Sequence, residues 1–94
     1  MASKEMSSVE IAKSLGVDAG LIREKHHLID LIKKARKESK FSQLQLAKKM
    51  GVTQGRIAQI ESKVGTNNVT LEVLLTILTE LKYTYKINVK KLAA

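Results

Sequence analysis

Three polar side chains in the segment TQGRIAQ, residues 53–59, have the chemistry needed to recognise the edges of DNA bases. A glutamine can form two hydrogen bonds with adenine N6 and N7, and an arginine can do the same with guanine O6 and N7 or grip a phosphate instead. Gln54, Arg56 and Gln59 could therefore read a base sequence. The alternative is that they are ordinary exposed polar residues, and the elements that position them bear on this choice.

The residues before this segment predict a short helix that ends in a tight turn. Ser42 is an N-cap candidate, because its hydroxyl can accept a hydrogen bond from a free amide of the first helical turn. Three apolar residues at helical spacing then form an inward face: Leu46, Ala47 and Met50. Gly51 follows as the residue that takes the left-handed backbone at a helix end, which glycine adopts without strain.

A second short helix is expected directly after this turn. Thr53 is its N-cap candidate, and Ile57 and Ile60 form its inward side. The polar residues then lie on the outward side: Gln54, Arg56 and Gln59. Two short helices joined by a tight glycine-containing turn form a helix-turn-helix.

The net charge of +8 is concentrated in the middle of the chain. Residues 1–30 hold four basic and five acidic residues, residues 31–65 hold nine and two, and residues 66–94 hold four and two. Such clustering is expected of a surface that binds nucleic acid, because neutralising phosphates releases condensed counterions. Charge alone would favour the simpler interpretation of a solvated helix face.

The composition argues against several other classes of protein. The chain has 94 residues, 44% of them hydrophobic, which fits one small helical domain, and it has no cysteine for a disulfide or a thiolate metal site. Its two histidines, His26 and His27, diverge by about 100° on a helix and cannot readily chelate one metal together. We therefore expect no enzyme, no metal and no cofactor. Neither a secretory signal nor a membrane span is visible, so a cytoplasmic location is expected.

Further helices are expected on both sides of the helix-turn-helix. A short one is predicted over residues 9–15, and a longer one follows Asp18 and continues through residues 21–39. Another follows Thr70 and covers residues 71–81, where leucines repeat on one face.

The period of the apolar residues changes after this last helix. Tyr83, Tyr85, Ile87 and Val89 alternate with polar residues, as a half-buried strand requires. A single strand in a helical chain needs a partner, either the same segment of a second subunit or an edge of a different protein. A frayed polar tail is the alternative, and the four apolar residues argue against it.

The segment SQLQLAKKMGVTQGRIAQIE, residues 42–61, resembles the helix-turn-helix of the phage repressor and Cro family. Residues 42–89 resemble more closely the HipB and HigA group of antitoxin repressors. The matching positions are Gln43, Leu46, Ala47, Gly51, Val52, Gln54, Ile57 and Glu61. One departure is Lys63, which stands where the family often has glycine, so the loop that follows the second helix could differ in shape.

The resemblance implies an all-α, lambda-repressor-like bundle with one C-terminal β-strand that forms an intermolecular sheet in a homodimer. It implies that double-stranded DNA is the ligand and that the residues nearest the bases lie at the start of the second helix and one turn later: Thr53, Gln54, Gly55 and Arg56, and then Gln59. Phosphate contacts are expected from Ser42, Gln43, Lys40 and Lys63. Glu61 is acidic in a basic region, so we expect it to pair with an amide or a basic side chain of the domain instead.

An echo of the helix-turn-helix occurs near the N-terminus. Residues 7–22 match residues 42–57 at seven of sixteen positions. Asp18, Ala19 and Leu21 stand there in place of the threonine, glutamine and arginine, and they cannot make the same contacts with bases or phosphates. We interpret this echo as a helix-turn-helix in shape only, with coincidence as the alternative.

These patterns predict three parts: an N-terminal helical arm over residues 1–27, a DNA-binding domain over residues 28–81, and a dimerisation strand and tail over residues 82–94. The expected function is a homodimeric repressor that binds a pseudo-palindromic operator, and the family resemblance adds an antitoxin role with a toxin protein as partner. The alternative is a protein-interaction module of the same fold without specific DNA recognition.

Overall fold

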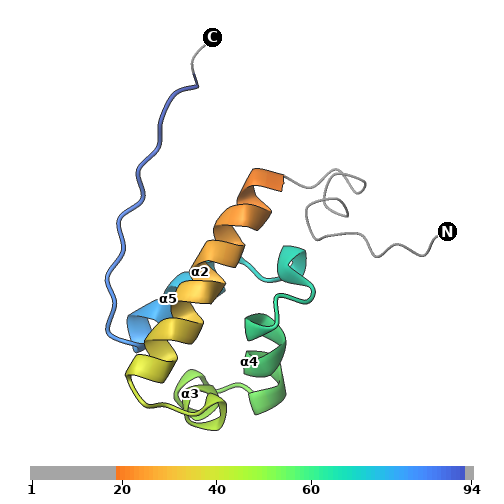
Figure 1. The fold of residues 1–94 in the computed structure, drawn as a ribbon, viewed down its shortest axis with the longest axis vertical. Helices are drawn as coiled ribbons and strands as arrows, with labels where there is room; N and C mark the ends of the chain where they lie inside the picture. Colours follow the sequence, from red (N-terminus) through yellow and green to blue (C-terminus); the bar gives the residue numbers. More distant parts are fainter. Residues whose placement is uncertain (1–18, 93–94) are drawn as a thin grey trace, which may run out of the picture.

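A computed structural model describes residues 19–92 of the chain. Its longest helix, α2 (Ala19–Glu38), contacts the elements that follow it (Figure 1). It is followed by α3 (Gln43–Met50), α4 (Gln54–Glu61), the short 3-10 helix η1 (Thr66–Asn68) and α5 (Leu71–Glu80). The described part of the chain is thus all-α, as expected, and consistent with a lambda-repressor-like helix-turn-helix. The helix expected over residues 9–15 lies outside the described residues.

The core lies between α2 and the four elements that follow it. Residues at three-to-four spacing on α2 face inward and are about 1% exposed: Ile22, Ile29, Ile32 and Ala35. Leu46 from α3, Ile57 from α4 and Leu74 from α5 are equally buried and, with the last three of those α2 residues, form one hydrophobic cluster. Helix α2 also runs without a break across residues 27 and 28, where the boundary between arm and domain was expected.

The helix-turn-helix has the predicted local geometry. Ser42 caps α3 and forms a capping box with Gln45, in which each side chain bonds the other residue's backbone. Gly51 ends α3 with φ of 72°, in the left-handed region that glycine favours. Thr53 then caps α4 by accepting a hydrogen bond from the Arg56 amide at 3.1 Å. These caps fix where α3 ends and where α4 begins.

Three lysines take the left-handed backbone directly after helices. Lys40, Lys63 and Lys82 have φ values of 61°, 65° and 70° and follow α2, α4 and α5. Lys63 occupies the position where the resemblance suggested glycine, and its positive φ is one that glycine would favour. The backbone at Lys63 therefore has the left-handed conformation that is typical of glycine, although the residue is a lysine.

Lys82→Gly is expected to raise the free energy of unfolding by roughly 0.5–1 kcal/mol, because glycine removes the strain of a left-handed non-glycine residue. The turn itself would be kept, since the Lys82 and Tyr83 amides bond the carbonyls of Thr79 and Leu78 through the backbone. Urea denaturation of Lys82→Gly and of the matched Lys82→Ala variant measures the effect. Equal stability of the two variants would contradict the claim that the left-handed backbone strains a non-glycine residue at position 82.

The segment after α5 is extended, and it runs past the helices toward the C-terminus (Figure 1). No strand is assigned to it, nor to any other part of residues 19–92. Its apolar side chains become more exposed along the chain, from 54% for Tyr85 to 63% for Ile87 and 88% for Val89. The predicted strand therefore has no pairing partner within the described part of a single chain.

No helix in the described part of the chain is long and apolar enough to span a bilayer.

Candidate nucleic-acid interface

The outward side of α4 presents the polar residues that the sequence singled out. Gln54, Gly55 and Gln59 are exposed and Arg56 is half-buried, with its Nη1 donating a hydrogen bond to Gln59 Oε1 at 3.3 Å. A Cβ at Gly55 would meet nothing closer than Thr53 Oγ1 at 4.0 Å, so packing within the described chain does not require glycine there. The start of α4 is thus open to a ligand that approaches from outside.

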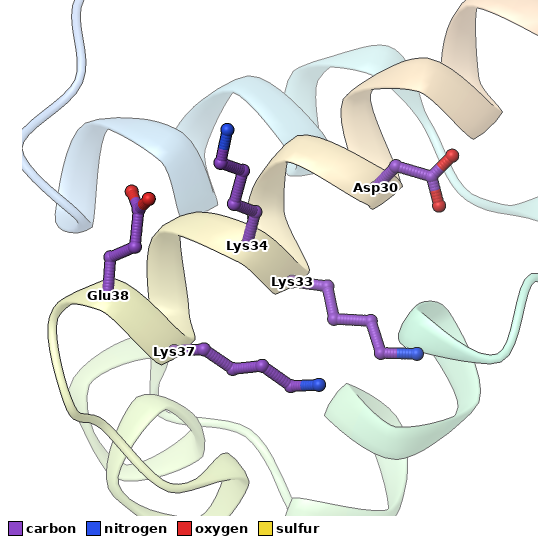
Figure 2. Close-up of a pocket in the computed structure, with 5 residues that line it drawn as sticks. All are labelled: Asp30, Lys33, Lys34, Lys37 and Glu38. Carbon is purple, nitrogen blue, oxygen red and sulfur yellow. The ribbon is translucent and has the colours of Figure 1, made fainter.

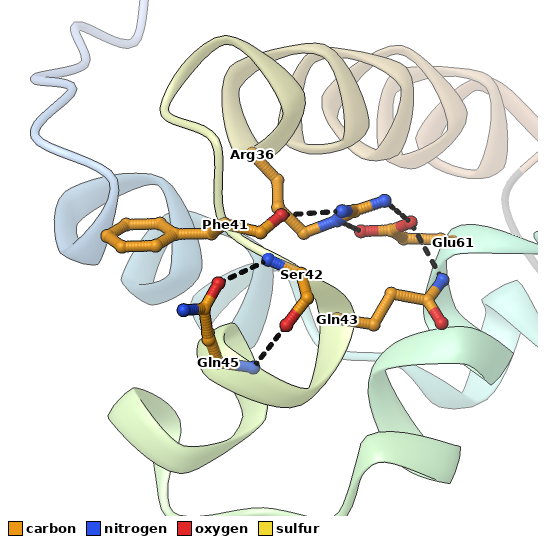
Figure 3. Close-up of polar contacts among 6 residues, drawn as sticks. All are labelled: Arg36, Phe41, Ser42, Gln43, Gln45 and Glu61. Atoms are coloured by element: carbon orange, nitrogen blue, oxygen red, sulfur yellow. Dashed lines mark hydrogen bonds and ion pairs between the residues drawn. The ribbon is translucent and has the colours of Figure 1, made fainter.

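A buried ion pair fixes α4 to α2 and α3 (Figure 3). Arg36 Nε and Nη2 donate to the two carboxylate oxygens of Glu61 at 2.6 and 2.9 Å, and Gln43 Nε2 donates to Glu61 Oε1 at 3.1 Å. Arg36 Nη1 also donates to the carbonyl of Phe41 at 2.8 Å. The expectation that Glu61 pairs with an amide or a basic side chain is confirmed, because it does both.

The hydrogen bonds of this network favour the charged forms of both Arg36 and Glu61. Burial would raise the pKa of Glu61, but the hydrogen bonds from Arg36 and Gln43 outweigh it and hold the pKa below its usual value. The hydrogen bond to Glu61 likewise raises the pKa of Arg36. Glu61 is therefore ionised at neutral pH and faces the domain's interior, with its side chain 3% exposed. Arg36 is the member of this network that the sequence did not identify.

The four residues predicted to contact phosphate differ in their exposure and in the partners that their side chains already have. Gln43 is half-buried and its amide nitrogen is held by Glu61, whereas Ser42 is exposed with its hydroxyl accepting from the Gln45 amide. Lys40 is exposed in the turn between α2 and α3. Lys63 lies after α4, and its Nζ is 2.7 Å from Asp30 of α2.

A second link ties α2 to the loop after α4. His26 Nε2 lies 3.0 Å from Thr66 Oγ1, which itself donates to the carbonyl of Lys63 at 2.9 Å. Because the Thr66 proton is used on that carbonyl, the imidazole is the donor in this contact. Burial, followed by the charge of Lys63, lowers the pKa of His26. The loop that carries Lys63 is thus held from two points on α2.

A family model described as helix-turn-helix matches residues 32–87, more than half of the chain. No curated protein and no solved structure gives a significant match. The matched segment contains the C-terminal third of α2, from residue 32, then α3, α4, η1 and α5, and the first part of the extended segment. The chain therefore belongs to the helix-turn-helix family of the XRE and Cro type, a family of DNA-binding, non-enzymatic proteins.

Proposed function

We propose that this protein is a sequence-specific transcriptional repressor whose helix α4 reads DNA in the major groove. The observation that carries the proposal is the outward side of α4, where Gln54 and Gln59 are exposed and Arg56 donates a hydrogen bond to Gln59. A side-chain cap and a buried ion pair fix the position of this helix. Thr53 and Gly55 lie at its start, where the backbone can come closest to the bases. Phosphate contacts come from Ser42, Gln43, Lys40 and Lys63 around this face.

Gln54→Ala is expected to cost about 1–3 kcal/mol of binding free energy at one base pair and to relax the preference at that position, because a bidentate contact with a base is lost. Fluorescence anisotropy on duplexes that differ by single base pairs measures this. Gln43→Ala is the comparison, since loss of a phosphate contact should weaken all duplexes by a similar factor. An unchanged base preference in Gln54→Ala would remove Gln54 from the reading residues.

The same proposal includes a homodimer joined by the extended segment. Tyr85 and Ile87 border a groove of about 390 Å³ between α2 and α5, whose remaining side chains are partly apolar. The other residues that line it are Leu21, Glu24, Leu28, Leu71, Leu75, Lys86 and Asn88. A strand from a second copy could pair with the free backbone edge and cover these apolar side chains. Two recognition helices would then face successive major grooves, about 34 Å apart.

An antitoxin role is the finer form of this proposal. It is supported by the resemblance of residues 42–89 to the HipB and HigA group, and it would add a toxin protein as a partner, bound by residues 1–27 or by the dimer's sheet. Under this proposal residues 28–81 form the DNA-binding domain and residues 82–94 the dimerisation segment. A protein-interaction module of the same fold is the competing function, and binding to DNA without any base preference would favour it.

A further inference from the structure

Three lysines stand on the exposed side of α2 and divide between two directions (Figure 2). Lys33 and Lys37 extend toward α4, whereas the Lys34 side chain extends in another direction, away from α4. Lys33 and Lys37 are four residues apart, so they share one side of α2 and lie about 6 Å apart along its axis. All three are exposed.

The surface formed by Lys33 and Lys37 adjoins the candidate nucleic-acid interface. Figure 2 shows both side chains extending toward α4, the helix that carries Glu61, and the charge of Lys33 helps to lower the pKa of that residue. Asp30, one turn before Lys33, binds Lys63 at 2.7 Å. Lys33 and Lys37 therefore extend from α2 on the side that faces α4, and Lys63 is bound to α2 one turn before Lys33.

The acidic residues near these lysines are engaged elsewhere. Asp30 pairs with Lys63, and Glu38 accepts a hydrogen bond from the Tyr83 hydroxyl at 3.5 Å. Glu61 forms a bidentate ion pair with Arg36. Within the described residues, no carboxylate lies within ion-pair distance of Lys33 or Lys37. Both cations are thus available to an external anion.

We propose that Lys33 and Lys37 bind successive phosphates of one DNA strand and so extend the interface from the helix-turn-helix onto α2. Their separation along the helix is comparable with the distance between neighbouring phosphates on a strand. Two compact, hydrated ammonium groups suit such contacts, which need charge but no fixed orientation. The inference rests on the proposed DNA-binding function and assigns to it two residues that lie outside the helix-turn-helix itself.

The test is the salt dependence of binding to a duplex of mixed sequence, measured for the full chain by fluorescence anisotropy. For Lys33→Ala with Lys37→Ala, the plot of log affinity against log salt should become less steep by about 0.9 for each lysine in each bound subunit. Lys34→Ala is the matched control, because it removes the same charge from the same helix at a side chain that extends away from α4. Its slope should stay close to that of the unmodified protein.

The outcomes separate the two proposals. A selective loss of slope in the Lys33 and Lys37 variants supports the extended interface. Equal slopes for all variants, or an equal loss for Lys34→Ala, would overturn it and leave these lysines as a solvated helix face, while DNA binding by the unmodified protein would stand. Absence of any salt-dependent duplex binding by the unmodified protein would overturn the proposed function and this inference together. Circular dichroism checks that each variant keeps its helices.

Discussion

Glu61→Ala is expected to lower the free energy of unfolding by about 3–5 kcal/mol, because it leaves the buried guanidinium of Arg36 without its carboxylate. The Arg36 and Glu61 side chains are only 10% and 3% exposed, so water cannot easily replace the lost partner. The amide of Gln43 would lose its acceptor as well. Urea denaturation followed by circular dichroism measures the loss.

The double variant Arg36→Met with Glu61→Leu is the control for this first prediction. Removing both charges leaves neither of them unpaired, so the double variant should be more stable than Glu61→Ala. The folded protein holds the Glu61 pKa below its unfolded value, so this stabilisation is complete above the usual glutamate range and is lost as the pH falls through the folded pKa. The double variant should lose less stability on acidification. A Glu61→Ala variant as stable as the unmodified chain would contradict the role of the ion pair.

Ile87→Asp is expected to produce a monomer and to lower the affinity for an operator with two half-sites by roughly 10²- to 10⁴-fold, the factor by which linking two binding modules raises affinity. Ile87 is 63% exposed in the single chain and borders the groove between α2 and α5. Burying a new carboxylate there against a second copy would be strongly unfavourable. Analytical ultracentrifugation and DNA titration measure the two effects.

Thr84→Asp is the matched control for the dimerisation segment, because it adds the same charge at an exposed position of the alternate set. We expect it to leave dimerisation largely intact. A monomeric unmodified protein would contradict the proposed dimer. An Ile87→Asp variant that remains dimeric would place the dimer contact elsewhere on the surface.

The helix-turn-helix could be predicted from the sequence because its signals are local. Ser42, Gly51 and Thr53 each act on amides or carbonyls within a few residues, and the structure finds each of them in the predicted cap or turn. The Arg36–Glu61 pair joins residues 25 positions apart. Only the packing of α2 on α4 brings them together, and a lysine- and arginine-rich helix offers no local sign of which cation turns inward.

The left-handed lysines mark a second limit of sequence patterns. A glycine after a helix predicts a left-handed residue, but Lys40, Lys63 and Lys82 take the same conformation without that signal. Here the turn is fixed by backbone hydrogen bonds and by the packing of neighbouring apolar residues such as Phe41 and Tyr83. A lysine can therefore hold a position that local propensity would assign to glycine.

The C-terminal strand and the N-terminal echo stay predictions for a different reason. Alternation from Tyr83 to Val89 predicts a strand, but a strand forms only against a partner, and a single chain supplies none in the described residues. Most of the echo, residues 7–22, lies outside those residues, as do residues 1–18 of the expected arm. The base and phosphate contacts likewise depend on a ligand, which the sequence identifies only by chemistry.

The central claim, that α4 reads a DNA sequence, is tested most directly by enriching random duplex DNA on the purified full-length protein at near-physiological salt. We expect recovery of a pseudo-palindrome whose half-sites lie about one helical turn apart. We also expect Gln54→Ala to enrich a sequence that is altered at one position in each half-site. Recovery of duplexes with no common sequence, held only by salt-sensitive contacts, would contradict specific recognition and favour a protein-interaction module.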